Sequence, residues 1–587
     1  MRTYPSLYPP TTPPITSVFT HLLSSTFSAH PPSSPAFTDA ASGTTLTRAA
    51  LRGRALQFAH GLRHDTRLRF ARGDTVLVLS PNSLAWPIAL FGLIAAGAVV
   101  STANPAYTPA ELAYQYRDSR AYLVFVHPEL VSAVLQMFKI VGVEEGEARK
   151  RVVVMRYEGV DRVERIGFVG MEELLGRGEA REEERFDGEG PVGANETVFL
   201  CYSSGTTGKP KGVMLTHKNI VYLNSMLFYG ISKLDPQKDV LIAVLPFYHA
   251  YGLLNLVQYP LLAGTQAIVM PRWDTALFCQ YVARYRISVA LVVPPMLLAL
   301  VHHPATQQYD MTSLNYISCG AAPAGKQLTD AAAAKLASVG ANVLVTQAFG
   351  MTEMSPHTHQ LRREDALRKP GSIGVLLPNL TARLVLPSSD AQEQDADAPE
   401  WDDGEEPLGG PGVRMSGRGE LWIKGPTLMK GYLNNAEATR NSVTTDGWYK
   451  SGDIMVRDEE GYWYAVDRQK ELIKYKGFQV APAELEALLL THPKVVDVAV
   501  IGIDAPALAT ELPRAYIVPS EPQASAAAFE KEIQDWFAQR VAQYKRLRGG
   551  VAIVDSIPKS PSGKILRRQL RDRVKAELDT EKARAKL

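Results

Sequence analysis

Short runs of β-branched residues alternate with amphipathic stretches along the chain, and this alternation restricts the possible folds more than any other feature. Residues 74–79 read DTVLVL and predict a strand, and residues 82–96 predict the helix that follows it. Residues 98–103 and 121–126 predict two further strands, with a helix over residues 108–118 between them. Strands separated by helices are typical of parallel sheets covered by helices. We therefore expect an α/β protein.

The chain is too long for a single hydrophobic core. At 587 residues it exceeds the usual length of one domain, and beyond about Asp467 the alternation gives way to shorter units. We predict one domain over residues 1–467 and a second over residues 468–587. In the second, residues 484–490 and 525–543 predict helices, and we expect the following strands: 495–502 and 515–518. Ser525 is a predicted N-cap, since its hydroxyl can accept a helix N–H.

Two charged tracts interrupt the large domain. Residues 388–416 are acidic and rich in Gly and Pro, and with little to bury they predict a disordered insertion. Residues 144–189 are heavily charged and predict a second surface insertion, with a strand over residues 151–155 inside it.

Composition restricts the partners. A net charge of +2 without a long basic run indicates that no nucleic acid is bound. The cysteines lack metal-ligand spacing and indicate a reducing compartment, and Cys319 is expected to be a packing residue. The longest apolar stretches, residues 87–100 and 289–301, are too short to span a membrane and predict buried elements.

The strongest local motif begins at Thr197, where a predicted strand enters a loop of hydroxyls, glycines and lysines. Glycines let backbone N–H groups turn toward an anion, hydroxyls donate further hydrogen bonds, and lysines neutralise phosphate charge. A Walker A loop is excluded because Pro210 follows the lysine. The residues predicted to bind phosphate are Ser203, Ser204, Gly205, Thr206, Thr207, Gly208 and Lys209.

With this loop as the first of a series, the chain resembles the acyl-adenylate-forming (AMP-binding) superfamily, and most closely its 4-coumarate–CoA ligase-like branch. The resemblance runs from the region of residues 35–51 to Leu566, and the motifs arrive in family order. The later motifs are LPFYHAYG from Leu245, GAAP from Gly320, QAFGMTE from Gln347, GELWIKG from Gly419, WYKSGD from Trp448, DRQKELIKYKGFQ from Asp467 and PKSPSGK from Pro558. The resemblance implies a large domain of α/β layers with a small β-barrel-like part, and a smaller, mobile α+β C-terminal domain.

The resemblance also implies roles in adenylation. Thr352 and Glu353 match the pair that binds the α-phosphate and Mg²⁺, and Asp453 and Arg468 match the residues that bind the ribose of ATP. Lys564 matches the catalytic lysine, whose long flexible side chain can bridge the acyl carboxylate and the phosphate.

Further residues are assigned by the same resemblance. His249 matches the histidine that borders the acyl pocket and orients the carboxylate, and Tyr251 lies beside it. The matches to positions that line the acyl-adenylate are Ala321, Gln347 and Ala348. At the junction of the two domains, Lys470, Lys474 and Gln479 match positions that contact the adenylate. Matches for coenzyme A are Lys476, Gly477 and Arg272. A hinge is expected at residues 467–470, because Lys564 and the coenzyme A face cannot address one acyl-phosphate centre together.

The function implied is an ATP-dependent ligase that converts an aryl or acyl carboxylic acid to an acyl-AMP and transfers the acyl group to coenzyme A, releasing AMP and pyrophosphate. Three alternatives stay open: a standalone enzyme that loads a carrier protein, a luciferase-like monooxygenase, and a non-enzymatic nucleotide-binding protein. After Glu353 the run of residues 354–360 is more polar and bulkier than in plant members. The acid is therefore left open, as are the oligomeric state and the pathway.

The last three residues, Ala585, Lys586 and Leu587, resemble a Ser-Lys-Leu peroxisomal address. They predict binding to the peroxisomal import receptor and a peroxisomal location. Without a functional tripeptide, the cytoplasm is expected.

Overall fold

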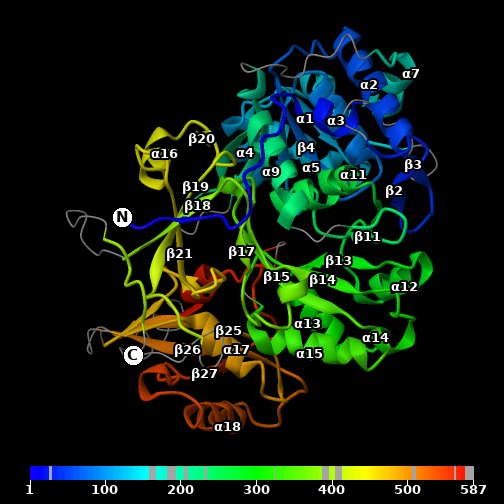
Figure 1. Ribbon diagram of the computed structural model, residues 1–587. Helices are drawn as coiled ribbons and strands as arrows, with labels where there is room; N and C mark the ends of the chain where they lie inside the picture. The colour runs from blue at the N-terminus through cyan, green and yellow to red at the C-terminus, as the bar shows by residue number, and fades with distance from the viewer. Residues whose placement is uncertain are drawn as a thin grey trace, which may run out of the picture.

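A computed structural model describes most of the chain (Figure 1). The described residues are 1–24, 29–157, 167–181, 193–203, 209–230, 234–322, 324–386, 396–402, 413–476, 478–505, 510–560 and 563–574. Predictions for Ser204–Gly208, Gly477 and the C-terminal tripeptide fall outside them, as does the side chain of Gln479.

An eight-stranded sheet forms the first layer of the large domain. Its order is β20-β10-β9-β5-β4-β6-β7-β8. The strands are β4 (Thr75–Leu79), β5 (Val99–Ala103), β6 (Leu123–Val126), β7 (Val152–Val154), β8 (Val169–Gly170), β9 (Thr197–Ser203), β10 (Lys211–Thr216) and β20 (Gly431–Tyr432). Those from β9 to β8 in this order are parallel, and β10 and β20 are added antiparallel. The predicted strands at residues 74–79, 98–103 and 121–126 are confirmed to within two residues.

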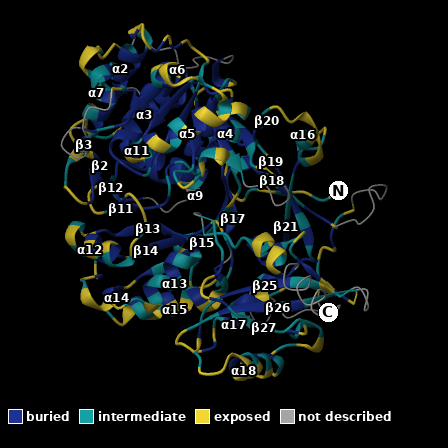
Figure 2. Cartoon of the chain, turned by 180° about the vertical axis from the view of Figure 1, so that it is seen from behind, coloured by how far each residue is buried: buried dark blue, intermediate teal, exposed yellow. Residues whose placement is uncertain are grey.

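Helices cover both faces of this sheet because the strand side chains alternate. Val76 and Val78 of β4 belong to the core that holds α2 (Arg48–His64) and α3 (Ala85–Ala95). Leu77 and Leu79 pack instead with α4 (Pro109–Asp118) and α5 (Val131–Val141). Every residue of α3 is buried, which explains why its sequence is apolar all round. In Figure 2 the strands and α3 are dark blue beneath outer helices with exposed yellow faces.

A nine-stranded sheet forms the second layer, in the order β17-β16-β15-β14-β13-β11-β12-β2-β3. Its strands are β2 (Pro35–Asp39), β3 (Thr45–Thr47), β11 (Val240–Ala243), β12 (Gln266–Val269), β13 (Val289–Val292), β14 (Tyr316–Cys319), β15 (Leu344–Gly350), β16 (His357–Gln360) and β17 (Val375–Leu376). On its lower side in Figure 1 lie α12 (Thr275–Tyr285), α13 (Pro294–His302) and α15 (Gly325–Ala337). The two sheets share one hydrophobic core.

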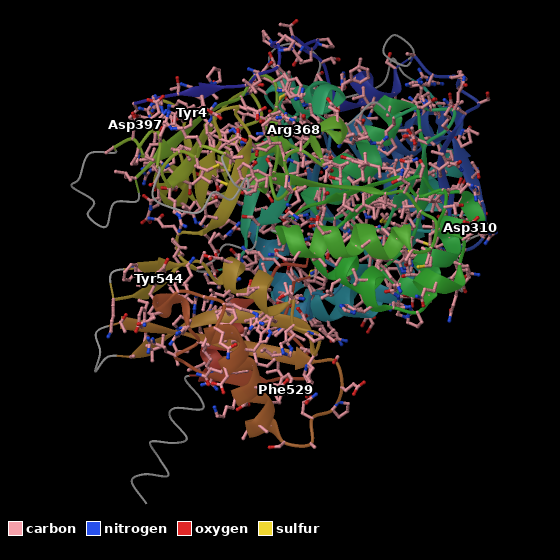
Figure 3. The ribbon with its side chains drawn as sticks, turned by 60° about the horizontal axis from the view of Figure 1, so that its bottom comes forward. Tyr4, Asp310, Arg368, Asp397, Phe529 and Tyr544 are labelled. Atoms are coloured by element: carbon pink, nitrogen blue, oxygen red, sulfur yellow. The ribbon has the colours of Figure 1, made fainter. Side chains whose placement is uncertain are left out.

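A five-stranded antiparallel sheet takes the place of the expected barrel-like part. Its order is β1-β18-β19-β21-β22, and its strands are β1 (Tyr4–Pro5), β18 (Thr381–Val385), β19 (Gly419–Lys424), β21 (Tyr449–Arg457) and β22 (Trp463–Arg468). The N-terminus pairs with β18, and the backbone N–H of Arg2 donates to Asp397, which lies beside Tyr4 in Figure 3.

The two predicted insertions are described only in part. Within residues 388–416, Ala398 is buried and Asp397 pairs with Val385, so these two residues pack on the sheet. Residues 388–395 and 403–412 lie outside the described residues, and the disorder expected of this tract stays a prediction. Within residues 144–189, α7 (Met171–Arg177) packs on α2 through the buried side chains of Met171 and Leu174. Two apolar residues on one helix face suffice for packing, although charge dominates the composition.

The small domain has its own core and lies below the five-stranded sheet (Figure 1). Its elements are β23 (Ile473–Tyr475), β24 (Phe478–Val480), α17 (Pro482–Leu489), β25 (Val495–Ala505), β26 (Thr510–Pro519), α18 (Ala526–Ala538) and β27 (Val551–Ile553). Ser525 caps α18 as predicted, accepting the N–H of Ala528, but the helix ends at Ala538, before the predicted Gln543. Phe529 of α18 is buried in this core (Figure 3).

Within the described residues, none of the helices combines the length and the apolarity needed to cross a bilayer. The three cysteines are free and buried, and burial raises the pKa of Cys319 to about 12, as expected for a packing residue.

Candidate active site

A cavity of about 1240 Å³ lies where both large sheets, the five-stranded sheet and the small domain meet. The ends of β9, β15, β20 and β21 open into it, as does the segment after β22. The small domain contributes residues around Lys564. Ligands of α/β proteins bind where strands end, so this cavity is the candidate active site.

The predicted site residues that line the cavity come from distant parts of the chain. They are Ser203, His249, Tyr251, Ala321, Ala348, Thr352, Glu353, Asp453, Arg468, Lys470 and Lys564. Ser203 ends β9, Thr352 begins a short 3-10 helix, and Lys564 lies in a loop of the small domain. The fold therefore brings together residues that are far apart in the sequence.

Glu353 lies in the short 3-10 helix Thr352–Met354 that follows β15, and two hydroxyl groups hold its carboxylate. Ser203 Oγ donates to Glu353 Oε1 over 3.1 Å, and Tyr432 Oη donates to the same oxygen over 2.9 Å. Oε2 accepts no hydrogen bond from the described residues. Glu353 is 8% exposed, so its carboxylate has a fixed position with one oxygen available to the cavity.

Asp453 and Arg468 form an ion pair at the cavity wall. Arg468 Nε lies 3.1 Å from Asp453 Oδ1. Burial raises the pKa of the Asp453 carboxyl, while Arg468 and Lys564 act to lower it. The Asp453 charge in turn raises the pKa of Arg468. The pair therefore offers a ligand the buried Asp453 carboxylate as a hydrogen-bond acceptor and the adjacent Arg468 guanidinium as a positive charge.

The turn before Asp453 is fixed by hydrogen bonds. Gly452 has a φ of 72°, and its N–H donates to Glu420 Oε1 over 2.9 Å. The N–H of Asp453 donates to Ser451 Oγ over 3.0 Å. A left-handed backbone is accessible to glycine without steric cost, so Gly452 allows the strand to turn its Asp into the cavity.

Lys564 is presented by a tight loop of the small domain. The N–H of Lys564 donates to Ser560 Oγ over 3.1 Å, and its carbonyl accepts the N–H of Ser560 over 2.8 Å. A Cβ added to Gly563 would come within 3.0 Å of Val293 and Pro295 in the large domain. Absence of a side chain at Gly563 therefore lets the loop approach the large domain closely.

The surroundings of Lys564 lower the pKa of its ammonium group. Burial and the neighbouring Arg468 lower the pKa of the Lys564 ammonium to about 8, against the opposing effect of Asp453. The lysine is thus protonated at neutral pH but loses its charge in mildly alkaline solution.

His249 is a neutral imidazole at the cavity wall. Burial lowers its pKa to about 4, and its Nδ1 accepts the N–H of Tyr251 over 3.2 Å. Because Nδ1 is the acceptor, the ring proton is on Nε2. The histidine can therefore donate one hydrogen bond from Nε2 without carrying charge.

Gln347 does not line the cavity itself. Its amide oxygen accepts the N–H of Ala324 over 3.0 Å, which ties the loop after β14 to β15. Ala321 and Ala348 of this wall do face the cavity, and Ala321 has a φ of 70°. Gln347 thus holds the wall from behind.

The remaining predicted residues lie outside the cavity. Arg272, Lys474 and Lys476 are exposed and do not line it. Lys209 also does not line it, and its ammonium lies 5.2 Å from the centre of the Tyr114 ring. In this arrangement Arg272 and Lys476, assigned to coenzyme A, lie outside the cavity, and so do Lys209 and Lys474, assigned to ATP and the adenylate.

Sequence reasoning missed several lining residues. Tyr432, Glu420, Ser451 and Lys211 all line the cavity. Glu420 and Ser451 lie inside quoted motifs and could have been found there, whereas Tyr432 has no motif around it. The pairing of β20 with β10 brings Tyr432 to the cavity.

The donors around Glu353 suit a hard cation. Mg²⁺ is commonly bound by one or two carboxylates together with substrate phosphates. The free Oε2 of Glu353, with the nearby hydroxyls of Thr352 and Ser203, supplies such a set for a phosphate-bound ion. Among the described residues no cluster of three or more His, Cys, Asp or Glu side chains could hold a metal alone.

Comparisons with known proteins cover nearly the whole chain. A family model described as AMP-binding enzyme matches residues 25–433, and one described as AMP-binding enzyme C-terminal domain matches residues 484–564. 4-Coumarate–CoA ligase 5 of Oryza sativa subsp. japonica is 35% identical over 546 residues, covering 92% of this chain and 91% of the relative. Peroxisomal OPC-8:0-CoA ligase 1 of Arabidopsis thaliana is 34% identical over 540 residues, covering 91% and 90%. The ATP-bound structure of MatB from Rhodopseudomonas palustris has a TM-score of 0.76 at 25% identity, covering 95% of this chain and 98% of that one.

Proposed function

The chain belongs to the AMP-binding enzyme family, and from this premise we propose how its residues carry out the reaction of an ATP-dependent acid–thiol ligase. The enzyme activates a carboxylic acid with ATP to an acyl-AMP and pyrophosphate, then transfers the acyl group to coenzyme A and releases AMP. The observation that carries the assignment is that Lys564 of the small domain reaches the cavity that also holds Glu353, Asp453 and Arg468.

In adenylation the acid carboxylate attacks the α-phosphate of ATP, so two anions must approach. The Asp453 carboxylate accepts hydrogen bonds from the ribose hydroxyls, and its ion pair with Arg468 fixes its position. With the ribose held in this way, the α-phosphate lies in the cavity. The Lys564 ammonium lies between carboxylate and phosphate and stabilises the charge that develops between them. His249 donates from Nε2 to the acid carboxylate and orients it.

Glu353 and Thr352 hold the phosphate end. Ser203 and Tyr432 fix the Glu353 carboxylate, so its free oxygen keeps one direction. Bound there, Mg²⁺ would neutralise phosphate charge. The predicted loop of Ser204–Gly208 and Lys209 binds the β- and γ-phosphates, and Ala321 and Ala348 border the adenylate.

The thioester step requires a different orientation of the small domain. Lys476 and Arg272 are proposed to bind the phosphates of coenzyme A, and Gly477 is assigned to coenzyme A together with Lys476. Lys474 and Gln479 contact the adenylate in that state. We propose that residues 467–470, at the boundary between the assigned domains of residues 1–467 and 468–587, form the hinge. At this boundary Asp467 Oδ2 accepts the N–H of Ala483, which links β22 to α17.

The test uses the intact protein with ATP, Mg²⁺, coenzyme A and a panel of acids. Cinnamic, phenylacetic, benzoic and medium- to long-chain fatty acids are scored for AMP release and for thioester. We expect both products from at least one acid. Adenylate without thioester would favour a carrier-protein acceptor, and light with luciferin and oxygen would favour a luciferase. The relatives named above are coenzyme A ligases, which supports coenzyme A as acceptor.

We also propose a peroxisomal location. Ala585–Leu587 resemble a peroxisomal address, and one relative carries the word peroxisomal in its name. Binding to the peroxisomal import receptor follows from that address.

A further inference from the structure

The loop that presents Lys564 is followed at once by a buried arginine. Arg567, three positions after Lys564, begins the helical segment of residues 567–574 and does not line the cavity. Its side chain is only 11% exposed. A cation buried to this extent requires charged or hydrogen-bonding partners, and these partners fix where the chain next to Lys564 lies.

Glu486 of α17 is the main partner of Arg567. Nη2 of Arg567 donates to both carboxylate oxygens of Glu486, over 2.7 and 2.8 Å. Its Nε donates to the carbonyl of Val500 in β25 over 3.2 Å, and the N–H of Val500 donates to Glu486 Oε1 over 2.8 Å. Glu486 is itself buried. Charge-assisted hydrogen bonds therefore hold Arg567 against two elements of the small domain.

Two further carboxylates bring the hinge region to the same guanidinium. Glu471, just after the predicted hinge, has a carboxylate oxygen 3.6 Å from Arg567 Nε and 3.4 Å from Arg571 Nη2. Asp467, at the start of the hinge, is buried; burial raises the pKa of its carboxyl to about 6, and the Arg567 charge opposes this rise. Arg567 thus interacts with carboxylates on both sides of the hinge.

The arm of the loop before Lys564 is held by a separate ion pair. Lys559 pairs with Ile565 across the loop, and its ammonium lies 2.6 Å from a carboxylate oxygen of Asp497 in β25. With this pair on one arm and Arg567 on the other, the backbone of Lys564 is fixed from both sides. A fixed backbone limits the directions in which a long, flexible lysine side chain can place its ammonium.

We propose that Arg567 is a positioning residue for Lys564, whose loop it holds at the cavity through its hydrogen bonds to Glu486 and Val500. The inference rests on the proposed ligase function and adds a residue to its adenylation step. Arg567 touches no substrate in this role. It keeps the Lys564 ammonium where charge develops between carboxylate and phosphate, so the loop need not be ordered during the reaction.

The charge of Arg567 has a second effect on Lys564. Burial and Arg468 lower the pKa of the lysine ammonium to about 8, Arg567 adds to this lowering, and Asp453 and Glu471 oppose it. Other cations that line the same cavity are Lys470 and Lys559. Removal of the Arg567 charge should therefore raise the pKa of Lys564 and move the alkaline decline of adenylation to higher pH. A substitution that only destabilised the domain would leave the folded molecules with the wild-type pH profile.

Arg567→Met tests the position of the loop in the intact protein. ATP–pyrophosphate exchange is measured with the acid of the panel above that gives the highest rate. We expect the kcat of exchange to fall about ten- to a hundredfold while the KM for ATP stays within about twofold, because the lost interaction is made in the transition state. Conversion of a supplied acyl-adenylate to thioester should keep the wild-type rate, since that step does not use Lys564. In a pH profile from about pH 7 to about pH 10, the midpoint of the decline should move upward.

Three further variants separate positioning from folding. Arg567→Lys keeps the charge but loses the geometry of the guanidinium, so it should retain the wild-type pH midpoint and regain part of the exchange rate. Glu486→Gln keeps an oxygen for the N–H of Val500 but loses the charge that holds Arg567, so it should lower the kcat of exchange by a smaller factor. Lys494→Met breaks an exposed ion pair with Glu532 in the same domain and is the matched control, which should change neither the rate nor the midpoint.

A wild-type kcat of exchange in Arg567→Met would overturn the proposal. So would an equal loss of both half-reactions with an unchanged pH midpoint, which is the result expected of a purely structural residue. If Arg567→Met does not fold, the other two substitutions in this contact decide, and an unchanged kcat in both Arg567→Lys and Glu486→Gln rejects the proposal. If the wild type shows no exchange with any acid, the ligase function fails and the inference fails with it. Exchange that is insensitive to these substitutions rejects the inference while the function stands.

Discussion

Asp453 and Arg468 lie directly opposite each other on the antiparallel strands β21 and β22, and their side chains form an ion pair of 3.1 Å. The Asp453 side chain is 9% exposed, so its acceptor oxygens are held rigidly at the cavity wall. Register between two strands, and not nearness in sequence, gives the proposed ribose site its geometry.

Asp453→Asn should weaken ATP binding. The substitution keeps the shape of the side chain but removes the charge that accepts both ribose hydroxyls. Since a hydrogen bond to a charged group contributes about 1.5–3 kcal/mol, the apparent KM for ATP should rise about ten- to a hundredfold. The steady-state rate of pyrophosphate release at varied ATP concentration gives this KM. Asp310→Asn, at an exposed ion pair with Arg286, is the control, and an unchanged KM in Asp453→Asn would remove the ribose assignment.

Lys564→Ala should separate the two half-reactions. Loss of the ammonium removes the charge that bridges carboxylate and phosphate, so acid-dependent pyrophosphate exchange should fall by about a hundredfold or more. Conversion of a supplied acyl-adenylate to thioester should persist, because that step uses the other domain orientation. Lys531→Ala, on the exposed face of α18, should affect neither. Loss of both half-reactions in a folded Lys564→Ala protein would contradict separate roles.

Adenylation should decline in alkaline solution. The pKa of Lys564 is lowered to about 8, and the protonated form, which predominates below that pH, is the active one. The rate should therefore fall about tenfold per pH unit above pH 8. His249, with a pKa near 4, is neutral throughout and adds no transition between pH 5 and 8. A pH profile of pyrophosphate exchange from about pH 5 to about pH 10 tests both the alkaline decline and the absence of a histidine transition.

Lys564→Arg is the matched variant for that profile. A guanidinium stays charged across the range, so the alkaline decline should disappear even if the overall rate is lower. A decline that persists with the same midpoint would assign the titration to another group.

Lys476→Ala and Arg272→Ala should each raise the apparent KM for coenzyme A. Each loses a charge-assisted hydrogen bond to a phosphate, so the increase should be about ten- to a hundredfold. Adenylation should change little, because both side chains are exposed outside the cavity. Arg286→Ala is a surface control. Normal coenzyme A kinetics in both variants would lead us to abandon these two assignments.

A fluorescent protein fused to the N-terminus should collect in peroxisomes. Deletion of Ala585–Leu587 removes the proposed address and should release the fusion to the cytosol. Co-localisation with a peroxisomal marker measures the distribution. A diffuse signal from the intact fusion would show that the tripeptide does not direct import.

Patterns within the sequence predicted the local elements well. The β-branched run at residues 74–79 and the apolar segment after it became β4 and α3, and Ser525 caps α18 as its hydroxyl and position suggested. The same patterns failed where packing overrides composition. Met171 and Leu174 pack α7 against α2 inside a tract whose charges predicted an insertion.

By itself, the sequence determined the α/β class, the smaller C-terminal domain and the order of motifs that identify an adenylate-forming ligase, because these are properties of local spacing and residue type. Only the tertiary structure decided which side chains meet. Ser203 and Tyr432 are 150 and 79 positions from Glu353, yet both donate to one of its oxygens. Gln347 lies behind the wall that its motif suggested it would line. Such contacts depend on the register of strands and on how the layers pack, which no short stretch of sequence encodes.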